Sequence, residues 1–82
     1  MPKQINAQIG ARIHQRRRAL RMTQKHLAAA IGITTQQIQK YEDGLATIAA
    51  ARLWQISQVL GVTPSDLYAG CQPASAPQME AA

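Results

Sequence analysis

The chain has 82 residues, a length that suits one domain whose core buries about 60% of the surface exposed in the unfolded state. This length does not favour an enzyme of two domains. Nine Lys and Arg residues against four Asp and Glu residues give a net charge of +5. The excess indicates a polyanionic partner, although a solvated helix surface would give the same composition.

The cysteine content and the N-terminal segment indicate a cytoplasmic protein. Cys71 is the single cysteine, so no disulfide can form within the chain and no site of several cysteines can bind a metal. Residues 1–4 lead into a polar, basic segment rather than the apolar run of a secretory signal. No stretch approaches the roughly 18 apolar residues that span a bilayer, so we expect no membrane partner.

The first predicted helix covers residues 5–20. Ile9, Ile13 and Leu20 recur there at helical spacing. Arg17 continues the same apolar stripe, where an unpaired charge would be costly to bury. This arginine therefore needs an acidic partner within the fold.

Two short helices follow, each with its own start signal. Thr23 as an N-cap and Gly32 as a left-handed stop predict a helix over residues 24–31. Thr34 begins the next helix with a predicted capping box. In this box the Thr34 hydroxyl accepts from the backbone N–H of Gln37, and the Gln37 side chain bonds back to the backbone of Thr34.

The third helix presents one narrow buried edge and is otherwise polar. Ile38 and Tyr41 form the buried edge, and Gly44 ends the helix. A fourth helix over residues 49–60 ends at Gly61 and has no residue at its start that could cap it.

The last predicted helix covers residues 64–68, with Thr63 as its N-cap and Pro64 at its first position. Residues 70–82 contain prolines and few large apolar residues, so we predict a disordered tail. No β-strand pattern appears. The sequence therefore predicts an all-α domain of five helices over residues 5–69.

The second and third helices are joined by residues 32–34 alone, which forces them to cross steeply as in a helix-turn-helix. The third helix then exposes amides, hydroxyls and an ammonium group, which match the base edges in the major groove of DNA. A merely solvated surface is the alternative, but this run of Gln and Thr adds little to helix stability. The side chains placed to read bases are Thr35, Gln36, Gln39 and Lys40.

Several stretches together resemble the lambda-repressor and Cro family of helix-turn-helix proteins, also called XRE regulators. They are TQ at 23–24, LA at 27–28, Gly32, ITTQQIQKYEDG at 33–44 and LGVTPSDL at 60–67. The resemblance covers residues 9–67 and implies a compact five-helix domain with its third helix in the major groove. It also implies a homodimer on a two-fold operator of double-stranded DNA, and a nucleoid-associated transcriptional regulator, more often a repressor. The sequence has no acid–base or nucleophile cluster to support an enzyme, and we expect no cofactor.

Carried over by position, the resemblance assigns roles to particular residues. Those expected to read base edges are Thr35, Gln36 and Lys40, with Gln39 as a weaker candidate. Those expected to contact phosphates are Thr23, Gln24, Gln37 and Arg52. The loop at 45–48 lacks the Lys or Arg that many relatives carry there, so any phosphate contact from this loop must use backbone amides.

The resemblance also supplies a partner for the arginine on the apolar stripe. Members of the family often join the first and third helices by an Arg–Glu bridge, and Glu42 directly follows the buried Tyr41. We therefore predict a structural salt bridge between Arg17 and Glu42.

Other classes of function stay open at this point. One is an antitoxin that neutralises a protein toxin and autoregulates its operon, since many antitoxins carry this domain, although the short tail does not favour it. Another is a cationic helix on an anionic membrane, against which the core-directed apolar residues of the first helix argue. His14 and His26 lack the spacing of metal ligands, so we expect no metal site.

Trp54 on the fourth helix is expected to pack rather than to stack on bases. A surface for dimer contact is expected from Trp54, Val59, Leu67 and Tyr68. The sequence does not separate contact between two copies from burial within one.

Overall fold

The computed structural model describes residues 2–69, which contain five helices joined by turns and loops. In chain order they are α1 (Pro2–Ala19), α2 (Gln24–Ile31), α3 (Thr35–Glu42), α4 (Ala50–Leu60) and α5 (Pro64–Tyr68). No strand occurs within these residues, and the predicted all-α fold is confirmed. The tail predicted over residues 70–82 lies outside the described part.

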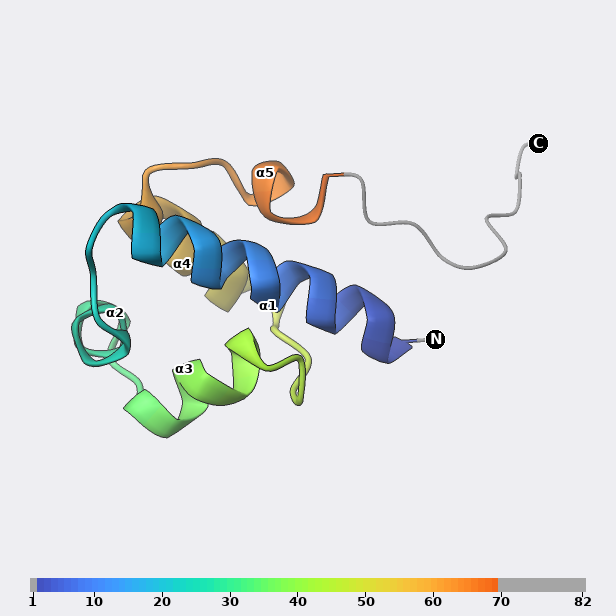
Figure 1. The fold of residues 1–82 in the computed structure, drawn as a ribbon, viewed down its shortest axis with the longest axis horizontal. Helices are drawn as coiled ribbons and strands as arrows, with labels where there is room; N and C mark the ends of the chain where they lie inside the picture. Colours follow the sequence, from blue (N-terminus) through green and yellow to red (C-terminus); the bar gives the residue numbers. More distant parts are fainter. Residues whose placement is uncertain (1, 70–82) are drawn as a thin grey trace.

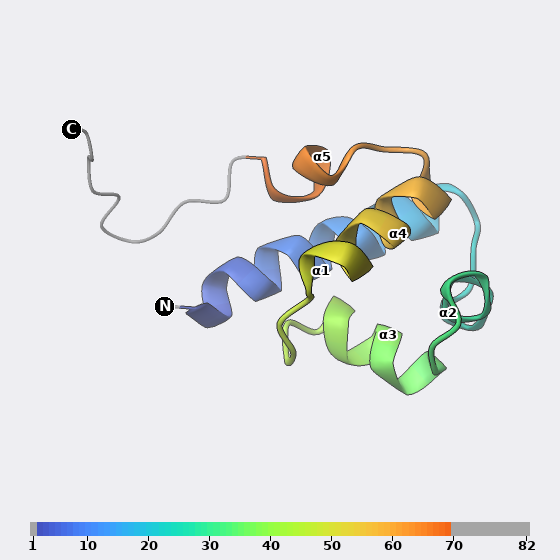
Figure 2. The same ribbon diagram turned by 180° about the vertical axis from the view of Figure 1, so that it is seen from behind.

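The helices pack around one apolar core. α1 and α4 lie side by side, α3 and α5 pack against opposite sides of α1, and α2 closes one end of the bundle (Figure 1; Figure 2). The buried apolar residues are Ile13, Leu27, Ala28, Ile38, Tyr41, Leu53, Ile56, Leu60 and Leu67. Every helix therefore contributes to the core. Within residues 2–69, no helix combines the length and the apolar composition that crossing a membrane requires.

Two details of α1 differ from the prediction. The helix begins at Pro2 rather than at residue 5. Proline loses no hydrogen bond at the first helical position, and the polar residues that follow it carry no apolar pattern to reveal the extra turn. Leu20, expected on the buried stripe, is 41% exposed and lies just after the last helical residue, Ala19.

Threonine hydroxyls cap three of the helices. The capping box predicted at Thr34 forms by half: the hydroxyl accepts from the N–H of Gln37 at 3.1 Å, but the described structure shows no return bond from the Gln37 side chain. A complete box lies at α5, where Asp66 and Thr63 each accept from the other's backbone. The backbone hydrogen bond from Thr63 lowers the pKa of Asp66, and this charged carboxylate accepts more strongly than a neutral amide does.

The backbones of α1 and α3 are in close contact at Gly10. A Cβ atom there would lie 2.7 Å from the carbonyl oxygen of Glu42 and would also clash with that of Tyr41. Gly44, just after α3, approaches the backbone of Ala7 in the same way. The absence of side chains at these glycines lets the C-terminal end of α3 reach α1, a requirement that the sequence analysis missed.

We expect Gly10→Ala to lower the free energy of unfolding by about 1 to 3 kcal/mol, because the added methyl group meets backbone atoms that cannot move without disturbing the core. At an open helix position the same change would raise stability by about 0.5 to 1 kcal/mol. Urea denaturation shows whether the free energy of unfolding falls or rises. Gln15→Ala, at an exposed position of α1, is the control, and a stabilised Gly10→Ala variant would contradict the close approach.

Candidate nucleic-acid interface

α2 and α3 form a helix-turn-helix unit. Gly32 ends α2 with a left-handed φ of 77°, and the N–H of Ile33 donates to the carbonyl oxygen of Ala28 at 3.0 Å. This pattern ends the helix and turns the chain at once, as a glycine stop allows. Ala28 is buried, and α2 packs directly on α3. The arrangement predicted for residues 23–44 is therefore confirmed.

The outward face of α3 is polar. The exposed residues on it include Thr35, Gln36, Gln39 and Lys40. A shallow surface hollow is lined by Gln36, Gln39, Lys40, Asp43 and Leu45. Leu45 is 70% exposed, so an apolar side chain stands beside amide, ammonium and carboxylate groups. No pattern in the sequence predicted this apolar part of the surface.

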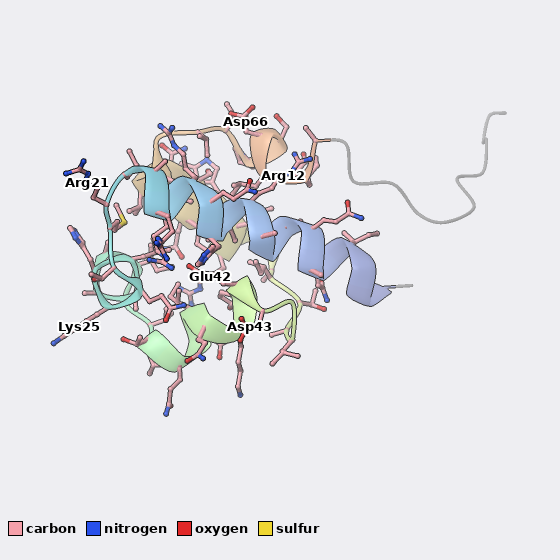
Figure 3. All side chains as sticks on the ribbon, in the orientation of Figure 1. Arg12, Arg21, Lys25, Glu42, Asp43 and Asp66 are labelled. Carbon is pink, nitrogen blue, oxygen red and sulfur yellow. The ribbon has the colours of Figure 1, made fainter. Side chains whose placement is uncertain are left out.

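A buried carboxylate at the C-terminal end of α3 joins three helices (Figure 3). Arg17 on α1 donates to Glu42 through Nε at 2.6 Å and through Nη2 at 3.0 Å. Gln24 on α2 donates through Nε2 at 3.0 Å, and Nδ1 of His14 on α1 lies 2.9 Å from the carboxylate. Arg17 and Glu42 are 6% and 8% exposed. The expected pair is thus present within a larger group, the Glu42 cluster, formed by Glu42, Arg17, His14 and Gln24.

Opposing effects act on the pKa of Glu42. Burial by itself would raise this pKa, because it takes the charged form out of water. Hydrogen bonds from Arg17, His14 and Gln24, together with the positive charge of Arg17, outweigh burial and hold the pKa of Glu42 below its ordinary value. The carboxylate is therefore ionised at neutral pH, and it neutralises the buried guanidinium.

The residues expected to bind phosphate lie at helix ends, and some already have partners inside the protein. Thr23 is exposed, and its Oγ1 accepts from the N–H of His26 at 3.0 Å. Gln37 is half-buried in the first turn of α3. Gln24 belongs to the Glu42 cluster. Only part of this set therefore points freely to solvent.

Arg52 has a structural role that the sequence analysis missed. Its Nη1 donates to the carbonyl oxygen of Ile31 at 3.1 Å and to Oε1 of Gln55 at 3.0 Å. Because Ile31 is the last residue of α2, this bond from α4 satisfies a carbonyl group at the helix end. The sequence alone does not reveal such a cap, since the two residues meet only through packing.

The Lys and Arg side chains of residues 5–69 divide into two groups. Those that donate to acceptors within the protein are Arg12, Arg16, Arg17 and Arg52. Those that are exposed and, within residues 2–69, take part in no salt bridge are Arg18, Arg21, Lys25 and Lys40. The second group lies on the end of α1, the turn after it, α2 and α3. The charge available to an external partner therefore gathers around the helix-turn-helix.

Comparison with known proteins identifies the family. A helix-turn-helix family model matches residues 13–67, which is more than half of the chain. The chain therefore belongs to the helix-turn-helix family of the lambda-repressor-like, or XRE, type.

Two relatives illustrate the similarity in sequence. The uncharacterized HTH-type transcriptional regulator y4wC of Sinorhizobium fredii is 50% identical over 67 residues, which cover 82% of this chain and 47% of the relative. An uncharacterized transcriptional regulator in the ATPase CF(0) region of Rhodospirillum rubrum is 47% identical over 64 residues, or 78% of this chain and 58% of the relative. This chain thus spans about half the length of the relatives that it matches.

Solved structures match the fold. The clp gene regulator ClgR from Corynebacterium glutamicum aligns with a TM-score of 0.75 and 21% identity, over 77% of this chain and 67% of that one. Hydroxypropylphosphonic acid epoxidase from S. wedmorenis aligns with a TM-score of 0.76 and 24% identity, over 80% of this chain but 35% of the epoxidase. At these identities the likeness concerns the fold alone.

We expect Arg17→Ala to lower the free energy of unfolding by about 3 kcal/mol or more, because it leaves Glu42 buried without its main counter-charge. Urea denaturation at neutral pH measures the change. Arg18→Ala removes the adjacent, exposed arginine and should cost less than about 0.5 kcal/mol. Equal losses in the two variants would contradict the structural role of the buried pair.

The Glu42 cluster also predicts how stability depends on pH. Because the pKa of Glu42 is lowered in the folded state, its stabilising effect is complete above the ordinary value of 4.5 and is lost as the pH falls through the lowered pKa. The difference in free energy of unfolding between wild type and Glu42→Gln should therefore shrink in acid. Urea denaturation from about pH 7 to about pH 3 tests this. A difference in free energy of unfolding that stays constant over this pH range would contradict the lowered pKa of Glu42.

Proposed function

We propose that this protein is a sequence-specific DNA-binding transcriptional regulator that reads the major groove with α3. The observation that carries the proposal is the exposed row of hydrogen-bonding side chains on α3, presented by a helix-turn-helix. An α-helix with its side chains is about 10 to 12 Å across, and the major groove is about 12 Å wide. The family match and the relatives named as transcriptional regulators support the same function.

Each side chain in the row suits a base edge. Gln36 and Gln39 can bond bidentately to N6 and N7 of adenine, and Lys40 can donate to O6 and N7 of guanine. Thr35 offers a hydroxyl group and a methyl group, of which the methyl suits thymine. Asp43, beside them, can accept from N4 of cytosine. This variety of groups supports selective rather than general binding.

Contacts to the sugar–phosphate backbone would hold α3 in register with the bases. The proposed contacts come from Thr23, Gln24, Gln37 and Arg52. Gln24 and Arg52 retain donors for this purpose, because an amide and a guanidinium carry more N–H groups than their internal bonds use. Gln24 and Arg52 would then contact DNA and a neighbouring helix of the domain at the same time.

A homodimer on a two-fold operator completes the proposed complex. Two copies of α3 would enter successive major grooves about 34 to 36 Å apart. Trp54 and Tyr68 are 56% and 47% exposed and offer apolar surface on α4 and α5 for contact between copies. Leu67, which the sequence analysis expected at this surface, is 2% exposed and belongs to the core of a single copy. It is therefore no part of the proposed interface.

Repression is the proposed direction of regulation. Its support is the resemblance to phage repressors and the physical fact that a dimer bound across a promoter excludes other proteins from the same DNA. The names of the relatives give no support to the antitoxin alternative.

The test is binding of the full chain to duplex DNA from the promoter region of its own operon, with the bound segment located by footprinting. We expect its affinity for that segment to exceed its affinity for an unrelated duplex of equal length, and to fall steeply with salt as counterions are released. Gln36→Ala should reduce the preference for the operator by about 1 to 3 kcal/mol, because it removes a bidentate contact to a base.

Gln58→Ala is the matched control. It removes the same amide from an exposed position of α4 and should leave the preference unchanged. Equal affinity of the wild type for operator and unrelated duplex would overturn the proposed function.

A further inference from the structure

A basic patch lies where α1 turns into α2, outside the row of side chains assigned to base reading. We define the corner patch as Arg18, Arg21 and Lys25, which line one surface hollow together with Thr23 and Gln24. The members of the corner patch are all exposed. Figure 3 shows Arg21 and Lys25 projecting outward from the α1–α2 turn and from α2.

No acidic side chain of residues 2–69 forms a salt bridge with this patch. Glu42 is buried and held by its own cluster. Asp43 lines the hollow on α3, and Asp66 caps α5 on the other side of α1 (Figure 3). The positive charges of the corner patch therefore add to one another and attract polyanions.

The backbone conformation of Arg21 is a second, independent indication that this residue has a role outside the fold. Its φ of 57° makes it the one non-glycine residue with a positive φ in the described chain. The other positions with this conformation hold Gly32, Gly44 and Gly61. A side chain in the left-handed region costs free energy that glycine avoids. Because the turn itself favours glycine, the arginine side chain points to a role outside the fold.

We propose that the corner patch binds the sugar–phosphate backbone of DNA at the edge of the groove that α3 enters. Guanidinium and ammonium groups bind phosphate oxygens whatever the base sequence. α2 packs on α3, and Thr23 and Gln24, already assigned to phosphates, line the same hollow. DNA that meets α3 would therefore pass this corner. The inference rests on the proposed function and extends the contact to the turn before α2.

The decisive variant is Arg21→Gly, because it separates a binding role from a folding role. Glycine relieves the backbone, so the melting temperature should be no lower than that of wild type. The slope of log affinity against log salt concentration should shrink by about 0.9 for each bound protomer, the effect of one lost phosphate contact on duplex DNA. Lys25→Ala should shrink it similarly. The preference for operator over unrelated duplex should not change, since no base contact is lost.

Arg12→Gln is the matched control, because it removes the same charge from α1 on the side next to Asp66 (Figure 3). It should change the salt slope less than Arg21→Gly does, although both variants have the same net charge. Arg21→Lys, which keeps a cation at this position, should retain the wild-type slope. Ethylation interference locates the phosphate that the corner patch contacts. Ethylation of that flanking phosphate should weaken binding of the wild type but not of Arg21→Gly.

The outcomes separate the two proposals. If Arg21→Gly and Lys25→Ala show the salt slope of Arg12→Gln, the corner patch does not contact DNA, and the inference is overturned while the proposed function stands. A clear loss of thermal stability in Arg21→Gly would also overturn it, because the arginine would then serve the fold. If the wild type binds no duplex, the proposed function itself fails.

Discussion

The rest of the structure depends on the buried carboxylate of Glu42. It accepts hydrogen bonds from Arg17 and His14 on α1 and from Gln24 on α2, so one group at the end of α3 connects three helices. α3 is short and polar, and it reaches the core along a single edge. A buried charge is tolerated only when its hydrogen-bonding partners are in place. The orientation of the outward face of α3 is therefore tied to one satisfied carboxylate.

Close packing and this buried charge depend on each other. Gly10 lets the backbone of α3 approach α1 at Glu42, and the same approach brings the carboxylate within reach of Arg17. The close approach and the ion pair support each other. A buried arginine without its partner is costly. The backbones of α1 and α3 stay in contact at Gly10 only if α3 is held at that point. The close helix contact and the Arg17–Glu42 ion pair therefore together fix how α3 lies on α1.

The same fold sorts the basic residues by function. Arg16 and Arg52 donate to the carbonyl groups of Leu60 and Ile31, the last residues of α4 and α2, and so serve the packing of the helices. The exposed basic residues Arg18, Arg21, Lys25 and Lys40 lie instead on the end of α1, the turn after it, α2 and α3. The net charge of the chain is therefore a poor measure of what it offers a partner. What matters is the part of the charge that the fold leaves in solvent, and where that part lies.

The sequence by itself determined most helix boundaries, because caps and stops such as Thr23, Gly32 and Thr34 act on neighbouring residues. It also indicated which face of α3 is exposed, through the 3.6-residue period, and, with the family resemblance, the partner of Arg17. Only the tertiary structure decided the side-chain contacts of His14, Gln24 and Arg52 and the role of Gly10. These depend on which helix ends and backbones meet when distant segments pack, and no local pattern in the chain encodes that.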